Sequence, residues 1–296
     1  MNINRRVFIK GVVASTAWPL FAGQNSEFDD NLVALLADTH IPGSVSPEYQ
    51  RDGLIKTVAD ILLLRPLPRN VLILGDFAYL FGKKEDYAAA AEIIAPLSGA
   101  GIRVTIAMGN HDRRAPFLER FPEYAQRTQV PGRIVSTVQT PHADFILLDS
   151  LDDGKVAGRL DDAQKEWLDE TLKNYQKPVF VTAHHPFREL GISKTLTAYP
   201  ATAGYLNGHN HVWRRAWIKR NWQEHYILRT LELPSTGHWG DIGYALMRIR
   251  PGRAVAELRQ RDFFYPKPAK SAAEAPPEWA AIVEENKGQT CTFFTS

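Results

Sequence analysis

The sequence "IRVTIAMGNHDRR" at residues 102–114 joins an apolar run to a dense group of polar side chains. Residues 102–107 are mostly apolar, which predicts a buried β-strand. Directly after it come Asn110, His111 and Asp112, an amide, an imidazole and a carboxylate in a row. A polar turn would explain this stretch on its own. The alternative is an active site at the end of the strand, and it requires other strands to end in the same way.

Four other apolar runs end in residue types that bind metals or catalyse reactions. Because ligands gather at the carboxyl ends of parallel strands, we expect the five polar groups to meet at one edge of the fold. The predicted strands and the polar residues that follow them are 32–37 with Asp38 and His40, 71–74 with Asp76, 178–183 with His184 and His185, and 203–206 with His209 and His211.

Predicted helices separate these strands. Helical spacing of apolar residues or richness in alanine marks residues 46–62, 83–98 and 161–175. This alternation predicts a parallel sheet with helices on its faces. Two further runs, at 133–138 and 144–148, also predict strands. Residues 212–264 contain alternating segments that predict antiparallel strands and therefore a second, more antiparallel sheet. The simplest assembly stacks the two sheets between layers of helices.

The polar groups have the chemistry that a pair of metal ions requires. Carboxylate, amide and imidazole side chains together suit divalent ions. Asp-x-His and His-x-His place two side chains on the same side of an extended segment. A carboxylate can bridge two ions, and two such ions clamp a phosphoryl group during in-line displacement. The residues therefore predict two metals rather than one.

The order D-x-H, G-D, G-N-H-D, H-x-P and G-H-x-H over residues 32–213 resembles the calcineurin-like metallophosphoesterase family. The resemblance implies an α/β fold, a four-layer αββα sandwich of two mixed β-sheets flanked by helices, in a catalytic domain at 29–265. It also implies hydrolysis of a phosphomonoester or phosphodiester by a metal-bound water or hydroxide. A non-catalytic protein that kept the fold and binds metal or a phosphate ligand is the alternative.

The resemblance also implies a role for each polar residue. Two divalent or mixed-valence transition-metal ions, drawn from manganese, iron, zinc or cobalt, would be bound. His111 would contact the phosphoryl group or protonate the leaving oxygen, and Asp112 would orient its ring. The implied ligands are Asp38, His40 and His211 for the first metal, Asn110, His184 and His209 for the second, and Asp76 as the bridge.

Tyr79 is a departure from the common pattern of the family. The sequence G-D-x-x-Y that ends at Tyr79 resembles the purple acid phosphatases, where the tyrosine binds ferric iron. That branch usually has D-x-G, whereas this chain has D-x-H with His40. We therefore expect Tyr79 to pack near the metals, with metal binding as the alternative.

Other residues near the motifs are candidates for supporting the ligands or contacting substrate. We expect His185 to support the neighbouring ligands rather than to bind metal. Arg113 would meet a phosphate oxygen, and the competing interpretation is a solvated pair with Arg114. Three aromatic residues would line the rim of the pocket, with plain loop packing as the alternative: Trp213, His238 and Trp239.

The N-terminus reads as an export signal. Residues 1–22 have a basic start followed by a short apolar run, as in a signal peptide. Arg5-Arg6-Val7-Phe8-Ile9-Lys10 resembles the twin-arginine motif, which implies the twin-arginine export machinery as a partner and a periplasmic or extracellular protein. An uncleaved helical anchor is the alternative. No later apolar stretch approaches the length of a transmembrane helix.

Composition excludes some function classes. The chain of 296 residues is 44% hydrophobic and 23% charged, which is typical of a globular protein. Removing the three positive charges of residues 1–22 turns the net charge of +2 into −1, so nothing indicates a nucleic-acid partner. Residues 266–296 read as a Pro/Ala-rich linker and a C-terminal tail with a short helix. The single cysteine, Cys291, can form no internal disulfide.

Overall fold

Two six-stranded sheets stacked face to face form the centre of the computed structural model. The structure describes residues 27–44, 48–219, 227–264 and 289–295. The predicted export signal, the linker and the short helix after it lie outside these residues.

The first sheet is mixed, and its parallel part contains the strand of the opening motif. Strands β1, β2 and β3 pair in parallel, and β10 joins β1 in the antiparallel sense. The order across the sheet is β12-β11-β10-β1-β2-β3. The strands are β1 (Phe28–Leu36), β2 (Leu67–Leu74), β3 (Arg103–Ala107), β10 (Gly240–Arg250), β11 (Gly252–Phe264) and β12 (Thr290–Thr295).

The second sheet has the same mixed character. Four neighbouring strands, β5, β6, β7 and β9, are parallel, and the two edge strands β4 and β8 run antiparallel to them. The order is β4-β5-β6-β7-β9-β8. The strands are β4 (Ser136–Gln139), β5 (Asp144–Leu147), β6 (Val179–Thr182), β7 (Thr202–Asn207), β8 (Arg214–Lys219) and β9 (Ile227–Glu232).

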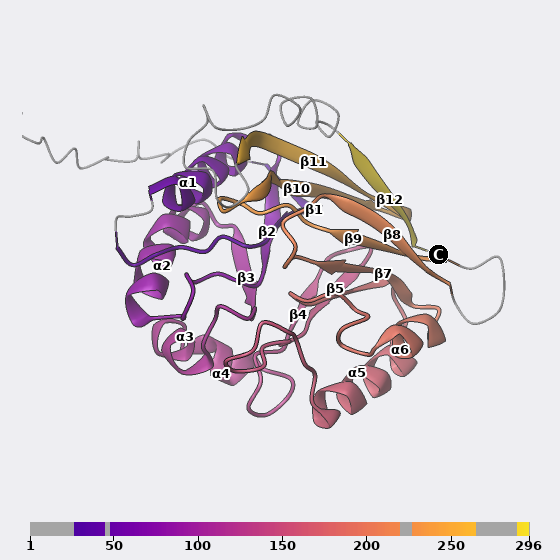
Figure 1. The fold of residues 1–296 in the computed structure, drawn as a ribbon. Helices are drawn as coiled ribbons and strands as arrows, with labels where there is room; N and C mark the ends of the chain where they lie inside the picture. Colours follow the sequence, from indigo (N-terminus) through magenta and orange to yellow (C-terminus); the bar gives the residue numbers. More distant parts are fainter. Residues whose placement is uncertain (1–26, 45–47, 220–226, 265–288, 296) are drawn as a thin grey trace, which may run out of the picture.

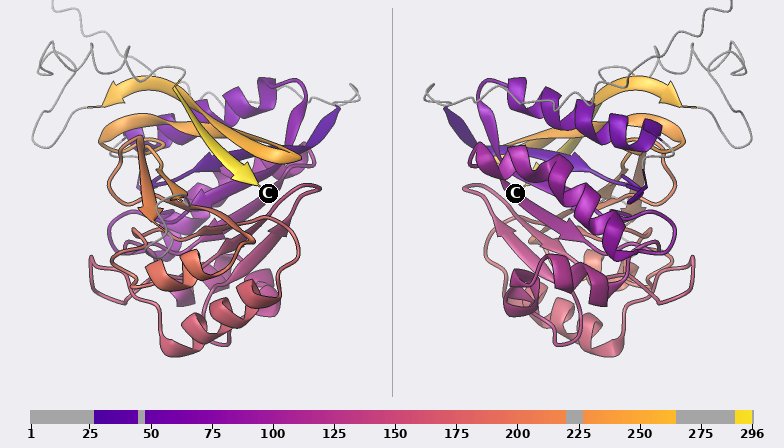
Figure 2. Two further views of the ribbon diagram at one scale, coloured as in Figure 1. Left: turned by 90° about the vertical axis from the view of Figure 1, so that its right-hand side faces the viewer. Right: turned by 90° about the vertical axis from the view of Figure 1, so that its left-hand side faces the viewer.

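Helices cover the outer face of each sheet (Figure 1). Helices α1 and α2 lie against the first sheet, and α5 and α6 lie against the second, as the two side views in Figure 2 also show. The short helices α3 and α4 follow β3. The helices are α1 (Glu48–Leu63), α2 (Lys84–Gly99), α3 (Arg114–Arg120), α4 (Glu123–Arg127), α5 (Asp162–Asn174) and α6 (Ser193–Ala198).

The continuous apolar runs of the sequence follow from this layering. In β1, Val33 and Leu35 face the core between the sheets, whereas Leu32, Ala34 and Leu36 face the helices. A strand buried on both faces has no polar side, so its sequence lacks alternation. The predicted four-layer αββα sandwich of two mixed sheets is confirmed.

The predicted division of the strands between the sheets is wrong. The strands of 212–264 do not form the second sheet by themselves, because β10 and β11 extend the first sheet and β8 and β9 join β7. The second sheet already begins with β4 and β5. Alternation of apolar and polar residues identifies a strand but does not identify its partner, which is fixed by burial of the whole face.

The C-terminal residues add a strand that the sequence pattern did not predict. Strand β12 lies within the predicted tail and pairs antiparallel with β11. Its Cys291 and Phe293 are buried in the core between the sheets, and Cys291 is a free thiol. Within the described part of the chain, no helix combines the length and apolar character that crossing a bilayer requires.

Candidate metal centre

The carboxyl ends of strands from both sheets meet at one edge. The backbone N–H of Asp38, after β1, donates to the carbonyl of Gly75, after β2, at 3.1 Å. In the second sheet, the N–H of Gly208 donates to the carbonyl of His184 at 3.1 Å. The two sheets are joined where the N–H of His209 donates to the carboxylate of Asp38, at 3.1 and 3.2 Å to its two oxygens. The polar groups therefore converge as the sequence predicts.

The backbone at this edge adopts a conformation that is unusual for residues other than glycine. A positive φ in a residue with a Cβ costs about 1–3 kcal/mol and persists only where the surrounding structure enforces it. Such residues cluster at functional sites. In this chain they include five of the predicted metal ligands: Asp38 (φ 53°), His40 (φ 47°), Asp76 (φ 50°), His209 (φ 79°) and His211 (φ 57°).

Asp38, His40 and His211 form one donor group. Nε2 of His211 lies 3.2 Å from Oδ1 of Asp38 and 3.2 Å from Nε2 of His40. Nε2 of His40 lies 3.8 Å from the same carboxylate oxygen. All three side chains are buried. Their donor atoms face a common point, as the ligands of one ion do.

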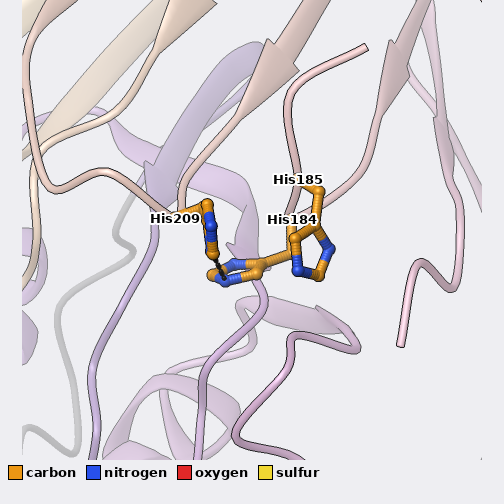
Figure 3. A group of neighbouring side chains, drawn as sticks. All are labelled: His184, His185 and His209. Carbon is orange, nitrogen blue, oxygen red and sulfur yellow. Dashed lines mark hydrogen bonds between the residues drawn. The ribbon is translucent and has the colours of Figure 1, made fainter. Parts of the chain in front are cut away.

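Asn110, His184 and His209 form a second donor group. Oδ1 of Asn110 lies 3.2 Å from Nε2 of His184 and 3.1 Å from Nδ1 of His209. The two imidazole nitrogens are themselves 3.3 Å apart, and Figure 3 shows the rings of His184 and His209 pointing toward one another. The amide oxygen and the two imidazoles thus converge from β3, β6 and β7.

Asp76 lies between the two donor groups. Its Oδ2 is 3.1 Å from Nε2 of His184 and 3.7 Å from Nε2 of His40. Its Oδ1 accepts a hydrogen bond from the backbone N–H of His111 at 2.8 Å. One carboxylate oxygen is therefore within reach of both groups, which is the position that a bridging ligand occupies.

Backbone carbonyls orient two of the imidazoles for metal binding. Nδ1 of His184 lies 2.9 Å from the carbonyl oxygen of Leu74, and Nδ1 of His211 lies 2.9 Å from that of Trp239. Because a carbonyl only accepts, each Nδ1 carries a proton, which leaves Nε2 as the ring atom that can bind a metal. Carboxylate, amide and imidazole donors arranged in this way fit manganese, iron, zinc or cobalt.

Charges within the site perturb its titratable groups. Burial opposes the charge of His184, but the carboxylates of Asp76 and Asp38 outweigh this effect and raise the pKa of His184 to about 10. Burial also opposes the charge of Asp76, yet His184 holds the pKa of that carboxyl well below its usual value. Burial, followed by the charge of His184, lowers the pKa of His209 to about 4. Perturbed pKa values of this kind cluster at functional sites.

His111 lies on the open side of the centre. Its side chain is 28% exposed, and Nε2 is 3.9 Å from Oδ2 of Asp76. Nδ1 lies 2.9 Å from the carbonyl oxygen of Leu80 and therefore donates to it. The ring can thus face a bound substrate while its orientation is fixed by the protein.

The expected role of Asp112 is wrong, because Leu80 rather than Asp112 orients the His111 ring. The buried carboxylate of Asp112 accepts hydrogen bonds from the backbone N–H groups of Gly109 at 2.9 Å and Ala78 at 3.1 Å. It thereby ties the loop after β3 to the loop after β2. Burial, and next the charge of Asp76, raise the pKa of Asp112 to about 6.

His185 lies beside the second donor group but presents no lone pair to it. Its ring centroid is 4.6 Å from that of His209, and Figure 3 shows it next to His184. Nε2 donates to the carbonyl of Val156 at 3.0 Å, which leaves Nδ1 to accept from the hydroxyl of Ser150 at 2.8 Å. In this position His185 supports the neighbouring imidazoles.

The two arginines after the opening motif do not form a solvated pair, because both bind neighbouring groups of the protein. The guanidinium of Arg113 donates to the backbone carbonyls of Asn110, at 3.1 Å, and Asp112, at 2.5 Å. Arg114, only 16% exposed, makes a bidentate ion pair with the buried Asp149 at 2.7 and 2.8 Å. Both side chains stabilise the loop that carries His111.

Three of the four aromatic candidates gather around the first donor group. The ring centroid of His238 lies 4.3 Å from that of His40, and that of Trp239 lies 4.3 Å from that of His211. Tyr79 approaches His238 edge-on at 6.5 Å. Trp213, by contrast, is buried in the core between the sheets.

Two residues that lie at the site were not predicted from the sequence. Nε2 of Gln50, on α1, lies 2.7 Å from Nδ1 of His238. The hydroxyl of Ser235 donates to the carbonyl of Asp38 at 2.8 Å. Neither residue belongs to a motif, and each meets a partner more than 180 positions away in the sequence. For Gln50, the available signal was a polar residue one helical turn before the apolar Leu54 on the same helix face.

Comparison with known proteins agrees with this geometry. The family model described as calcineurin-like phosphoesterase matches residues 32–213. A probable cyclic nucleotide phosphodiesterase of Synechococcus sp. is 27% identical over 55% of this chain and 60% of its own length. A protein of the same description from Psychrobacter arcticus is 25% identical over 50% of this chain and 55% of its own length. The chain thus spans about 60% or less of the length of these curated relatives.

Solved structures share the fold. A dimetal phosphatase from Danio rerio superimposes with a TM-score of 0.62 at 16% identity, covering 78% of this chain and 96% of that one. The purple acid phosphatase PPD1 from yellow lupin gives 0.59 at 14% identity, covering 88% of this chain and 53% of that one. At such identities the likeness extends to the fold alone. The family model matches more than half of the residues of this chain, and the chain therefore belongs to the calcineurin-like phosphoesterase family.

Proposed function

We propose that the protein is a hydrolase that cleaves a phosphodiester at a centre of two metal ions. The observation that carries this proposal is the position of Asp76, whose Oδ2 lies 3.1 Å from His184 in one donor group and 3.7 Å from His40 in the other. A single carboxylate with access to both groups supports two neighbouring sites rather than two separate ones.

The two donor groups would hold the ions. Two bound ions supply positive charge that activates water and neutralises the phosphoryl oxygens. The ligand sets of the proposal are Asp38, His40, His211 and the bridging Asp76 for one ion, and Asn110, His184, His209 and the same Asp76 for the other.

His111 is the residue proposed to act on the substrate. Its Nδ1 donates to the carbonyl of Leu80, so Nε2 is the atom directed to the open side. In the protonated ring, Nε2 would donate to a phosphoryl oxygen or transfer its proton to the leaving oxygen. Asp112 contributes indirectly, because it holds the loop on which His111 stands.

Two observations favour a diester over a monoester. A monoester carries a second negative charge, which enzymes commonly neutralise with arginine. The two arginines next to the centre are engaged elsewhere, Arg113 with backbone carbonyls and Arg114 with Asp149. The relatives described as probable cyclic nucleotide phosphodiesterases also act, by their description, on a diester.

The test compares esters on protein of known metal content. Protein stripped with a chelator and then supplied with Mn²⁺ should hydrolyse bis(p-nitrophenyl) phosphate with a higher kcat/KM than p-nitrophenyl phosphate. Cyclic nucleotides should serve as substrates, and the stripped protein should be inactive. Equal or better hydrolysis of the monoester would contradict the diester assignment, and full activity without metal would contradict the mechanism.

A further inference from the structure

We propose that His238 is a substrate-binding residue that donates its Nε2–H to a phosphoryl oxygen, and that Gln50 positions its proton. The proposal rests on the proposed function, because it assigns a role at the same centre. It concerns a residue in the loop between β9 and β10, outside all the motifs that define the family resemblance.

His238 lies next to the first donor group without belonging to it. Its ring centroid is 4.3 Å from that of His40 and 5.4 Å from that of His211. Four groups of histidines and carboxylates within the described ranges have donor atoms close enough to share an ion, and none of them includes His238. The ring is partly exposed to solvent. An imidazole in this position can meet a molecule bound at the metals.

Gln50 determines which nitrogen of His238 carries the proton. The amide nitrogen of Gln50 is 2.7 Å from Nδ1 of His238, and an amide N–H can only donate. Nδ1 therefore accepts, and the neutral ring carries its proton on Nε2. Since Nδ1 faces α1, the Nε2 edge is turned away from that helix. Gln50 is fully buried, so its side chain has little freedom to give up this contact.

The loop that carries His238 is held in place on two sides. The hydroxyl of Ser235 donates to the carbonyl of Asp38 and accepts from the N–H of His238, both at 2.8 Å. On the other side, Gly237 packs so closely on α1 that a Cβ at Gly53 would lie 2.5 Å from its Cα. A binding group that is fixed before the substrate arrives loses little entropy on binding. This rigidity supports a role in recognition.

A competing explanation is that His238 only packs against His40 and keeps that ligand in place. The two roles predict different losses. A packing role affects retention of the metal ions, whereas a binding role affects affinity for phosphate and leaves the metal content unchanged.

The experiment uses the manganese-loaded protein and three variants, His238→Ala, His238→Gln and Gln50→Leu. Calorimetry measures the Kd of inorganic phosphate, elemental analysis measures manganese per chain, and kinetics with bis(p-nitrophenyl) phosphate measure KM and kcat. The matched control is His142→Ala, which removes an imidazole before β5, at the opposite end of that strand from its carboxyl end.

We expect the phosphate Kd and the KM of His238→Ala to rise by about 10- to 100-fold, because this variant loses a hydrogen bond to a charged oxygen. His238→Gln keeps an N–H donor and should recover part of the loss. Gln50→Leu should raise both constants by roughly 3- to 10-fold. Manganese content should remain that of the unaltered protein in every variant.

Two outcomes would overturn the proposal: an unchanged phosphate Kd in His238→Ala, or a loss of manganese in that variant, which would assign His238 to the support of His40. The phosphate measurement needs no turnover. A protein that binds phosphate through His238 but hydrolyses no ester would therefore refute the proposed function and leave this inference standing.

Discussion

Oδ2 of Asp76 lies 3.1 Å from Nε2 of His184, in a buried pair that belongs to the proposed second metal site. The same pair governs the charge of the site, since the carboxylate raises the pKa of His184 to about 10 despite burial. The proposed metal ligands therefore also set the protonation state of the site.

Metal binding should release a proton from His184. With a pKa of about 10, the imidazole is protonated at pH 7 in protein stripped of metal, but a metal needs its lone pair. The affinity for the metal should therefore rise about tenfold per pH unit between pH 6 and 9. The reason is that, below the pKa, the fraction of neutral imidazole increases about tenfold for each unit by which the pH increases. His209, whose pKa is lowered to about 4, should add no proton.

Calorimetry of Mn²⁺ binding at pH 7, in buffers of different ionisation enthalpy, measures this release. The dependence on buffer should correspond to about one proton from His184. A binding enthalpy that is the same in all buffers would show that His184 is neutral before the metal binds.

His111→Ala should lower turnover and spare the metals. General acid catalysis typically contributes about 10²–10⁴ in rate, and the ring stands on the open side of the centre. The loss should be smaller for an ester with a nitrophenolate leaving group, which needs little protonation. Steady-state kinetics with good and poor leaving groups measure this difference, and His142→Ala is the control. A variant that loses metal would instead make His111 a ligand.

Asp112→Asn should destabilise the fold and not merely slow catalysis. The carboxylate accepts from Gly109 and Ala78, and an amide replaces one acceptor oxygen with a donor that faces these N–H groups. We expect a loss of about 2–4 kcal/mol in the free energy of unfolding. Urea titration measures it, with the exposed Glu92→Gln as the control. Unchanged stability together with slow catalysis would contradict this account and would support a role for Asp112 in orienting the His111 ring.

Export through the twin-arginine route remains a proposal from residues outside the described ranges. Replacing both arginines, Arg5→Lys with Arg6→Lys, should leave the protein in the cytoplasm, because the motif is read through that pair. Immunoblots of cytoplasmic and periplasmic fractions measure the distribution. Normal export of the double variant would reject this route.

The convergence of the polar residues could be predicted from the sequence because each group follows an apolar run, and four of the five runs form strands that are buried where they end, while β3 is buried only in its last two residues. The end of such a run marks the carboxyl edge of the sheet, so the pattern alone groups Asp38, Asp76 and His184. Helix-spaced and continuous apolar patterns likewise predicted the layers of the sandwich.

What the sequence did not predict depends on contacts between distant segments. The pairing of β10 with β1 and of β12 with β11 places strands from the end of the chain in the first sheet. Asp112 follows His111 directly, which suggested a partnership, but its side chain turns inward to Gly109 and Ala78. Gln50 meets His238 only after α1 packs on the loop before β10.

The metal content of the protein tests the central claim most directly. Elemental analysis of Mn²⁺-loaded protein, purified without refolding, should approach two ions per chain, and Asp76→Ala should lower this number because the proposed bridge touches both donor groups. The variant should also lose at least about 10³ in kcat/KM for bis(p-nitrophenyl) phosphate, since charge stabilisation by the metals is worth several kcal/mol. A saturating value of one ion per chain with full activity, or an Asp76→Ala variant within tenfold of the unaltered protein, would contradict the binuclear centre.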